Sequence, residues 1–219
     1  MTGFKKVLGV GAAFALAIAL GGCAGHSEPK QAEQPAQKAP AAQVQKKADA
    51  PAAKKITLEK WAGEWNGFHK YLDKPEVQKA YEEAAKDKKS TPEAIKKELV
   101  ERRKCEFNGL RIKGNTIEFL DGFAKDGAKT VTKATYECVD SKKVMHGGHQ
   151  LEWDVFKAKE SDAKYPVLLM MPVHGEEELV HFHMRYGTNA DELLKKDKWF
   201  PTFVKPDSTL AQIEGEIKE

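Results

Sequence analysis

The sequence predicts a mainly β domain with added α-helices, whose short antiparallel strands form a closed barrel or a sandwich. Beyond about residue 104, apolar residues recur at every second position, which is the period of a half-buried strand. Turn-forming pairs such as Asp121-Gly122 and Gly147-Gly148 separate these segments. Helix signals gather towards the two ends of the domain and do not alternate with the strands, which disfavours a βαβ arrangement.

The individual elements follow from local signals. Pro near a segment start, hydroxyl caps and apolar residues at helical spacing predict helices over residues 74–86, from 90 to about 100, from 189 to 194 and from 208 to 217, with Ser208 as the last cap. Period-two patterns predict strands over 110–112, 116–120, 130–139, 150–158, 165–173 and 179–186. Residues 113–115 predict a hairpin turn, and 199–203 an aromatic-proline turn.

Residues 1–22 have the features of a lipoprotein signal peptide. Lys5 and Lys6 precede an almost wholly apolar run from Val7 to Leu20, which is shorter than the roughly 20 residues of a membrane span. The segment that ends at Cys23 resembles a lipobox, in which this cysteine is lipidated and becomes the mature N-terminus. An ordinary secretory signal with an incidental cysteine is the alternative.

Residues 23–55 predict a disordered tether, and residues 56–219 predict the folded domain. The tether is mostly Ala, Gln, Pro and Lys without aromatic residues, so it cannot bury enough apolar surface to offset the entropy of ordering. The signal carries +2 and the tether +3, whereas the whole chain carries +3, which leaves −2 for the folded domain. The domain lacks the basic excess of a nucleic-acid-binding protein, and we expect no nucleic acid partner.

The folded domain contains two cysteines, Cys105 and Cys138. An exported protein enters an oxidising compartment, where an even pair forms a disulfide more often than it stays reduced. We therefore predict a Cys105–Cys138 disulfide, which would contribute ~3–4 kcal/mol in the chain-entropy model. Two unpaired buried cysteines are the alternative.

Three histidines form the principal candidate site. His181-Phe182-His183 places two imidazoles on the same face of one predicted strand, about 6–7 Å apart along the chain. His174 ends the preceding strand, so a hairpin brings it back beside the pair. Three neutral imidazoles with an open fourth position suit zinc, with copper, nickel or cadmium as competitors. We expect them to meet inside the barrel, because coordination satisfies buried imidazoles. A polar face with one histidine towards solvent is the alternative.

Two further groups carry weaker signals. In His146-Gly147-Gly148-His149, two histidines flank two glycines; loose metal capture is one interpretation, and a surface turn with incidental histidines is favoured. Glu176, Glu177 and Glu178 lie in the connection after His174 and can supply an occasional fourth oxygen ligand. A solvated acidic turn is the favoured interpretation of these three residues.

The order of these motifs resembles the ZinT (YodA) family of periplasmic zinc-binding proteins over residues 56–219. The similar pieces are a Gly-x-Trp typical of the entry strand of lipocalin-like barrels, the histidines and the aromatic turn, namely Trp61 to Trp65, His174, His181-Phe182-His183 with Gly187, and Trp199 to Phe203. The resemblance implies a calycin/lipocalin-like antiparallel β-barrel with added helices. It further implies that His174, His181 and His183 bind zinc or another divalent metal. The implied role is scavenging, buffering or delivering periplasmic zinc, in some members with a zinc-import binding protein as partner.

We therefore expect a non-catalytic protein of zinc homeostasis on the periplasmic side of a bacterial membrane, anchored by lipid at Cys23. Ala24 is not the aspartate typical of inner-membrane retention, which favours the outer membrane. One alternative is a zinc-dependent hydrolase or lyase, since three histidines and a water form the same first shell, with Glu178 nearby but no His-Glu-x-x-His motif. Another is a carrier of a small apolar ligand, which a barrel permits.

Overall fold

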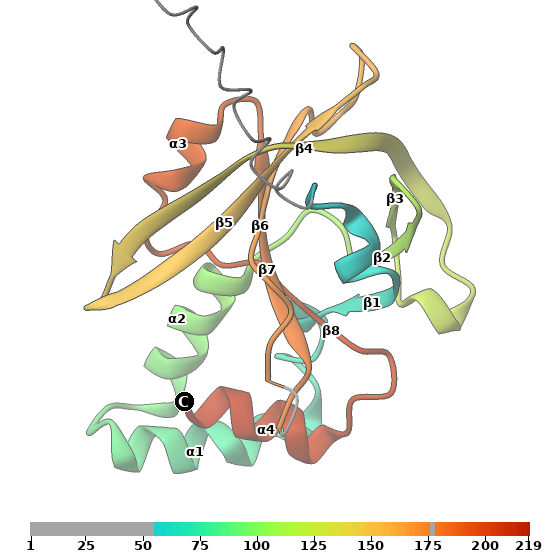
Figure 1. Cartoon of the computed structure of the whole chain (residues 1–219). Coiled ribbons are helices and arrows are strands. Elements are labelled where there is room, and N and C mark those ends of the chain that lie inside the picture. The colour runs from blue at the N-terminus through green and yellow to red at the C-terminus, as the bar shows by residue number, and fades with distance from the viewer. Residues whose placement is uncertain (1–54, 176–177) are drawn as a thin grey trace, which may run out of the picture. The chain divides into compact units, whose positions relative to one another are not determined.

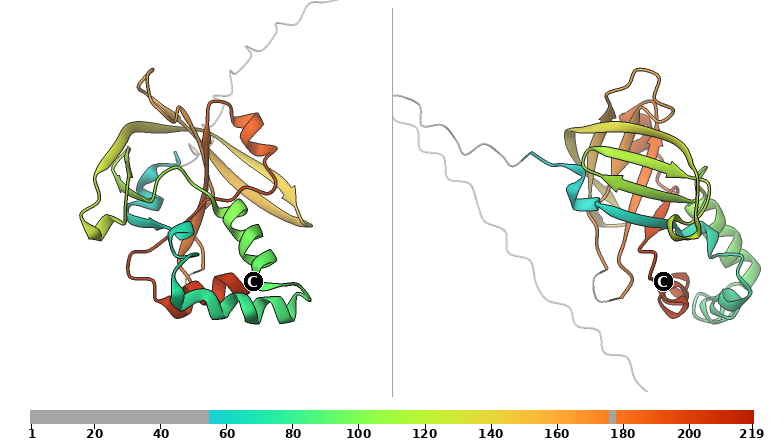
Figure 2. Two further views of the ribbon diagram at one scale, coloured as in Figure 1. Left: turned by 180° about the vertical axis from the view of Figure 1, so that it is seen from behind. Right: turned by 90° about the vertical axis from the view of Figure 1, so that its right-hand side faces the viewer.

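The computed structural model describes residues 55–175 and 178–219 (Figure 1). Eight antiparallel strands follow one another round a sheet that closes on itself, because β8 pairs with both β7 and β1 (Figures 1 and 2). The strands are β1 (Gly63–Gly67), β2 (Gly109–Lys113), β3 (Thr116–Leu120), β4 (Thr130–His146), β5 (His149–Ala158), β6 (Val167–Met170), β7 (His181–Gly187) and β8 (Thr202–Val204). The predicted closed antiparallel barrel with added helices is confirmed.

The helices have the local signals that the sequence displays. They are α1 (Gln78–Asp87), α2 (Pro92–Arg103), α3 (Ala190–Leu194) and α4 (Leu210–Lys218), with 3-10 turns η1 (Leu58–Trp61), η2 (Phe68–Lys70), η3 (Pro75–Val77) and η4 (Ala124–Asp126). The Thr91 hydroxyl accepts from the backbone N–H of Ala94 and caps α2, and Asn189 caps α3. The last helix is capped by Thr209 in a capping box with Gln212, and the prediction of Ser208 as its cap is wrong.

Three strands differ from the prediction. β6 spans only Val167–Met170, within the expected range of 165–173. β4 runs to His146, beyond the expected end at residue 139, and pairs with β5 along its second half. The segment from Trp199 to Phe203, expected to be only a turn, enters β8 at Thr202. This strand is short, and its pairing with β1 closes the ring, so its existence depends on partners distant in sequence.

Successive side chains of a strand point to opposite faces of the sheet, which gives one apolar cluster inside the ring and others outside it. On β7, Phe182, Met184 and Tyr186 belong to the cluster that fills the ring, together with residues of the other strands. The outer face carries a second cluster, here called the outer cluster, which consists of Trp153, Val155, Val167, Leu169, Leu193 and Phe200. A third cluster joins η2 and η3 to α1, α2 and α4. The helices therefore pack on the outside of the sheet, and α1 contacts both α2 and α4.

The predicted disulfide is contradicted, because Cys105 and Cys138 are both free thiols. Cys105 lies between α2 and β2 in a pocket with Tyr186, whereas Cys138 lies on β4 in another pocket with Phe156. Burial raises the pKa of the Cys105 thiol to about 12, so this thiol stays protonated. An even count of cysteines indicates that a pair can form, but the fold places the two thiols in different surroundings.

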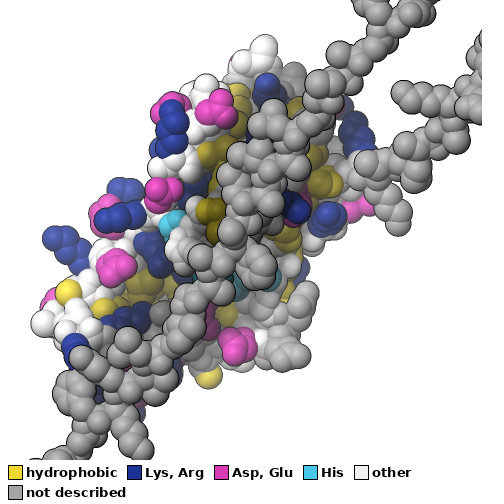
Figure 3. All heavy atoms as spheres, turned by 60° about the vertical axis from the view of Figure 1, so that its left-hand side comes forward, with side chains coloured by type: hydrophobic (Ala, Val, Ile, Leu, Met, Phe, Trp, Pro, Cys, Tyr) yellow, Lys and Arg dark blue, Asp and Glu magenta, His cyan; other side chains and the backbone are white. Residues whose placement is uncertain are grey.

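The remaining N-terminal predictions lie outside the described residues. These are the signal peptide 1–22, the lipidation site Cys23 and residues 23–54 of the tether. Within the part that the structure describes, no helix is long and apolar enough to cross a membrane. On the face visible in Figure 3, basic and acidic side chains intermix without forming a field of one sign.

Candidate metal centre

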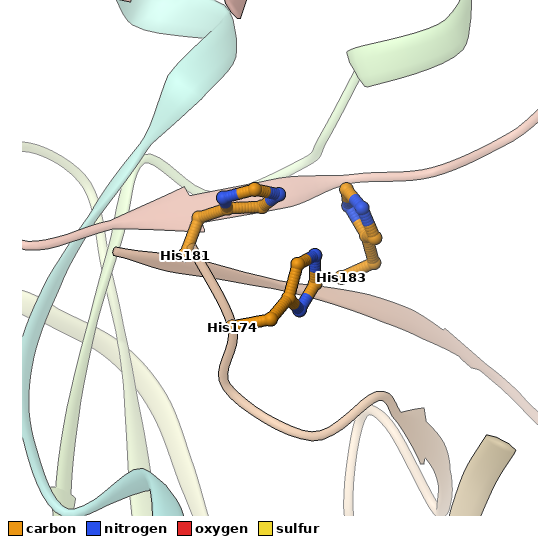
Figure 4. Close-up of side chains that lie close together, drawn as sticks. All are labelled: His174, His181 and His183. Carbon is orange, nitrogen blue, oxygen red and sulfur yellow. The ribbon is translucent and has the colours of Figure 1, made fainter. Parts of the chain in front are cut away.

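His174, His181 and His183 converge as the hairpin hypothesis predicts (Figure 4). His174 and His181 form an antiparallel bridge, in which each backbone N–H donates to the other carbonyl at 3.0 and 2.9 Å. His183 follows two residues along β7 on the same side of the strand. One ligand nitrogen from each residue lies within 4.8 Å of the other two. We call these three residues the histidine triad.

The histidine triad lies on the outer face of the sheet, so the expectation of a site inside the barrel is wrong. Phe182 points into the ring, where it packs edge-on against Trp65 with ring centroids 4.8 Å apart. The histidines on either side of it must therefore face outwards, towards α2 and α4. The burial of three apolar side chains of β7 in the core decides this orientation. The histidines are then enclosed from outside the sheet by residues of α2 and α4.

Each imidazole is held through its Nδ1 atom. In His174 this atom lies 2.8 Å from the Pro172 carbonyl oxygen, and in His181 it lies 2.7 Å from the Leu179 carbonyl oxygen. Because a carbonyl only accepts, both Nδ1 atoms must carry the proton, which leaves the Nε2 lone pair of each ring free. Backbone atoms two residues away thus set the tautomer that a metal needs.

The third ring is oriented by Thr202 on β8. Its hydroxyl donates to the Phe200 carbonyl oxygen at 2.9 Å and accepts from an Arg103 guanidinium nitrogen at 2.7 Å. The remaining lone pair faces the Nδ1 atom of His183 at 2.9 Å, so this ring also donates through Nδ1 and presents Nε2. The same Arg103 nitrogen lies 3.3 Å from that Nδ1 atom, as a donor facing a donor.

A buried ion pair stands behind the triad. Arg103, the last residue of α2, contacts Glu216 of α4 at 2.5 Å, and both side chains are 6% exposed. Burial lowers the pKa of Arg103 to about 10, which leaves it protonated at neutral pH, and burial raises the pKa of Glu216 against the opposing effect of Arg103. The pair joins two helices to the metal centre through Thr202.

Burial also favours the neutral form of two of the three imidazoles. It lowers the pKa of His181 to about 4 and holds the pKa of His183 well below its usual value of 6.5, with the neighbouring Arg103 acting in the same direction. Both rings are therefore neutral near pH 7, and neutral imidazole is the form that binds a metal.

The donor set fits Zn²⁺. Two nitrogens that bind one tetrahedral zinc ion at ~2.0–2.1 Å stand about 3.4 Å apart, so nitrogens already within 4.8 Å reach that geometry by small ring rotations. Three neutral nitrogens leave one position for water or a further ligand, a set that copper and nickel also accept. Among the described residues this ligand group contains no carboxylate: Glu178 is exposed, and Glu176 and Glu177 lie outside the described residues.

The sequence predicted the three histidines of the triad but not Arg103, Thr202 and Glu216 next to them. Arg103 is 80 residues from His183 and 113 from Glu216, so no local pattern links them. The one available signal is Glu216 beside Ile213 and Ile217, a charge on the apolar face of the terminal helix. Such a charge is rarely buried without a partner.

Comparison with protein families agrees with this geometry. Residues 42–219 match the family described as ZinT (YodA) periplasmic lipocalin-like zinc-recruitment proteins. The chain belongs to the ZinT family. Among curated proteins, no sequence matches this ZinT chain significantly.

Solved structures show the same fold. The Zn(II)-bound ZinT-like domain of AdcA from Streptococcus pneumoniae is 24% identical, with a TM-score of 0.61, over 78% of this ZinT chain and 94% of that domain. The Zn(II)-bound AdcA of the same organism is also 24% identical, with a TM-score of 0.62, but the match spans 37% of that longer chain. At this identity the likeness shows the fold.

Proposed function

We propose that this protein binds Zn²⁺ through His174, His181 and His183 and acts without catalysis, as a periplasmic scavenger or buffer of zinc. The observation that carries the proposal is the convergence of three imidazoles, each with one ligand nitrogen within 4.8 Å of the other two. The Nδ1 atom of each ring is engaged by a neighbouring oxygen, which leaves Nε2 for the ion. Family membership supports the ion, since zinc recruitment is the family's described role. Copper, nickel and cadmium are the expected competitors.

Under this proposal, each residue of the site has a separate role in zinc binding. His181 is 8% exposed and supplies a rigid, neutral ligand, while His174 is half-buried on the hairpin. Thr202 fixes the His183 ring, and Arg103 holds Thr202. Because His181 and His183 are neutral near pH 7, Zn²⁺ does not have to displace a proton from the Nε2 atom of either ring.

Isothermal titration of Zn²⁺ into the metal-free protein tests the proposal. His181→Ala and His183→Ala should each weaken binding by about a hundredfold or more, beyond the usual 10- to 100-fold effect of an outer-shell change. Phe182→Leu is the matched control, because this side chain lies between the two ligands but faces the core. Equally tight binding in both histidine variants would end the proposal.

We further propose that residues 1–22 are a lipoprotein signal, that Cys23 carries the lipid and that residues 23–55 tether the domain formed by residues 56–219, with the outer membrane as the favoured site. The sequence around Cys23 and the composition of the tether support this arrangement. Mass spectrometry of the mature N-terminus should find a lipidated Cys23. Cys23→Ser should move the protein from the membrane fraction to the soluble one, and an unmodified N-terminus would contradict the anchor.

We propose that the protein delivers its zinc ion to a zinc-import binding protein. The family's recruitment role supports a partner that receives zinc. The rate of zinc loss should be measured with a metal-free import binding protein as acceptor. It should be faster when the two proteins are mixed directly than when a dialysis membrane separates them. Equal rates in the two formats would contradict direct transfer.

One pocket favours a second candidate function, the carriage of a small apolar ligand. A pocket of about 880 Å³ is lined by Tyr165, Tyr186 and Trp199 together with several lysines. This size and this mixture of aromatic and charged groups are typical of small-molecule sites. Native mass spectrometry of protein purified from cells separates the two functions, since bound zinc supports the first and an organic adduct supports the second.

A further inference from the structure

The hairpin between β4 and β5 carries two histidines that the triad does not use. His146 ends β4 and His149 begins β5, and the two residues are paired directly across the strands. Between them, Gly147 and Gly148 have φ angles of 56° and 85°, the left-handed conformation that a tight two-residue turn requires. The turn therefore fixes the two histidines opposite each other.

Both imidazoles leave the hairpin on the same face. Residues directly opposite in an antiparallel pair have Cβ atoms about 4.5–5.5 Å apart on one side of the sheet. Two positions before His146, Val144 pairs with Leu151 on that side, and both pack against the outer cluster. The histidine pair thus continues the outer face, on which the histidine triad also lies.

One aromatic ring connects the two groups of histidines. The His146 ring lies 5.2 Å from the Phe200 ring, and the His183 ring lies 5.5 Å from the same Phe200 ring. His146 is half-buried by this packing, whereas His149 is exposed. The hairpin tip and the triad therefore share Phe200 as a neighbour, with the His146 ring packed against it and the His149 ring exposed.

We propose that His146 and His149 form a second metal site, which takes a transition-metal dication such as Zn²⁺, Cu²⁺ or Ni²⁺ and completes its coordination with water. Two opposed imidazoles at this separation reach one ion by rotation about their side-chain bonds, and imidazole is a preferred ligand of these ions. The site binds more weakly than the triad because it has two protein ligands and is open to water. The Arg102 guanidinium, 5.2 Å from the Phe200 ring, adds a repulsive charge.

Weak binding at an exposed tip beside a tight site suits the first capture of an ion on its way to the triad. This capture role rests on the proposed function, whereas the second site itself does not.

Titration of Zn²⁺ into the whole protein tests the second site. We expect a tight step and a weaker step, and His149→Gln should weaken the second step by at least about tenfold, or 1.4 kcal/mol, while leaving the first unchanged. Met145→Gln is the matched control: this side chain is 67% exposed at the same tip but points to the opposite face. A single step, or a second step that His149→Gln leaves unchanged, would overturn the proposal.

Paramagnetic broadening locates the second site independently. Substoichiometric Cu²⁺ added to the zinc-loaded protein should erase the amide NMR signals of residues 145–150, and the double variant His146→Gln/His149→Gln should keep them. Sharp hairpin signals in the parent protein would refute the site. In His181→Ala/His183→Ala, loss of the tight step with survival of the weak step supports both proposals. If the parent protein lacks the tight step but hairpin broadening persists, the proposed function alone has failed.

Discussion

Replacing Glu216 by Gln isolates one buried charge beside the metal centre. The amide preserves the shape of the side chain but removes the negative charge that lies 2.5 Å from Arg103. Arg103 keeps its charge near pH 7, because a guanidinium is effectively always protonated in proteins. The variant therefore leaves a guanidinium that is 6% exposed and lacks a counter-ion, 3.3 Å from the Nδ1 atom of His183.

Two effects of known size follow. Removing one partner of a buried ion pair costs about 3–5 kcal/mol of unfolding free energy, because the other charge remains desolvated. The uncompensated positive charge also opposes a dication at the triad. Glu216 contacts Arg103 and not a histidine, so zinc affinity should fall by about tenfold, the lower end of the roughly 10- to 100-fold effect of losing a direct partner of a metal ligand. We expect both losses in Glu216→Gln.

Urea unfolding of the metal-free protein at pH 7.5 measures the first effect, and Zn²⁺ titration measures the second. The double variant Arg103→Met/Glu216→Leu separates charge from packing: it should recover most of the stability, because an apolar pair of similar volume replaces the ions. A Glu216→Gln protein within about 0.5 kcal/mol of the parent would refute the reasoning, since that is the range of an ordinary surface change.

Four further changes test other parts of the structure. Lowering the pH from 6.5 to 4 should lower the unfolding free energy of the metal-free protein by about 3 kcal/mol through His181 alone. The folded pKa of His181 is about 4, below its unfolded value, so the unfolded chain binds the proton first as the pH falls. Urea unfolding at several pH values measures this loss, and stability independent of pH in this range would contradict the burial of His181. Thr202→Val should lower zinc affinity about tenfold in titration, whereas Thr202→Ser should not, because only the hydroxyl orients His183. Phe182→Ala should cost about 3–5 kcal/mol in urea unfolding through a core cavity, and a loss confined to zinc affinity would place this ring outside the core. Gly175→Ala should strain the hairpin by about 1–3 kcal/mol and weaken zinc binding. The φ angle of Gly175 is +79°, and an added Cβ atom would collide with the Leu179 carbonyl oxygen. Unaltered zinc titration and urea unfolding curves would show that the turn tolerates the alanine.

The sequence predicted the histidine triad because its signal is local. His181 and His183 share a face by the period of a strand, and the short connection after His174 allowed a hairpin that the structure contains. The same period does not say which face is the core. Comparing Phe182, Met184 and Tyr186 with the histidines and Arg185 would have indicated that the apolar set turns inwards.

Long-range contacts could not be predicted in this way. Arg103 meets Thr202 across 99 residues, and the closing strand β8 exists only through its neighbours. The disulfide failed for the same reason, since the count of cysteines contains no information on distance. Helix ends fared better, because caps such as Thr91 act within one turn.

Because the triad faces outwards, the proposed ion site and the hydrophobic core lie on opposite faces of the sheet. An ion bound there touches side chains that project from the sheet, while the aromatic filling of the ring remains sealed behind Phe182. An ion at this place would be separated from the hydrophobic interior by β7 itself, so its binding and release would not require the ring to open. A partner that approaches this side can take the ion while the rest of the molecule keeps its shape.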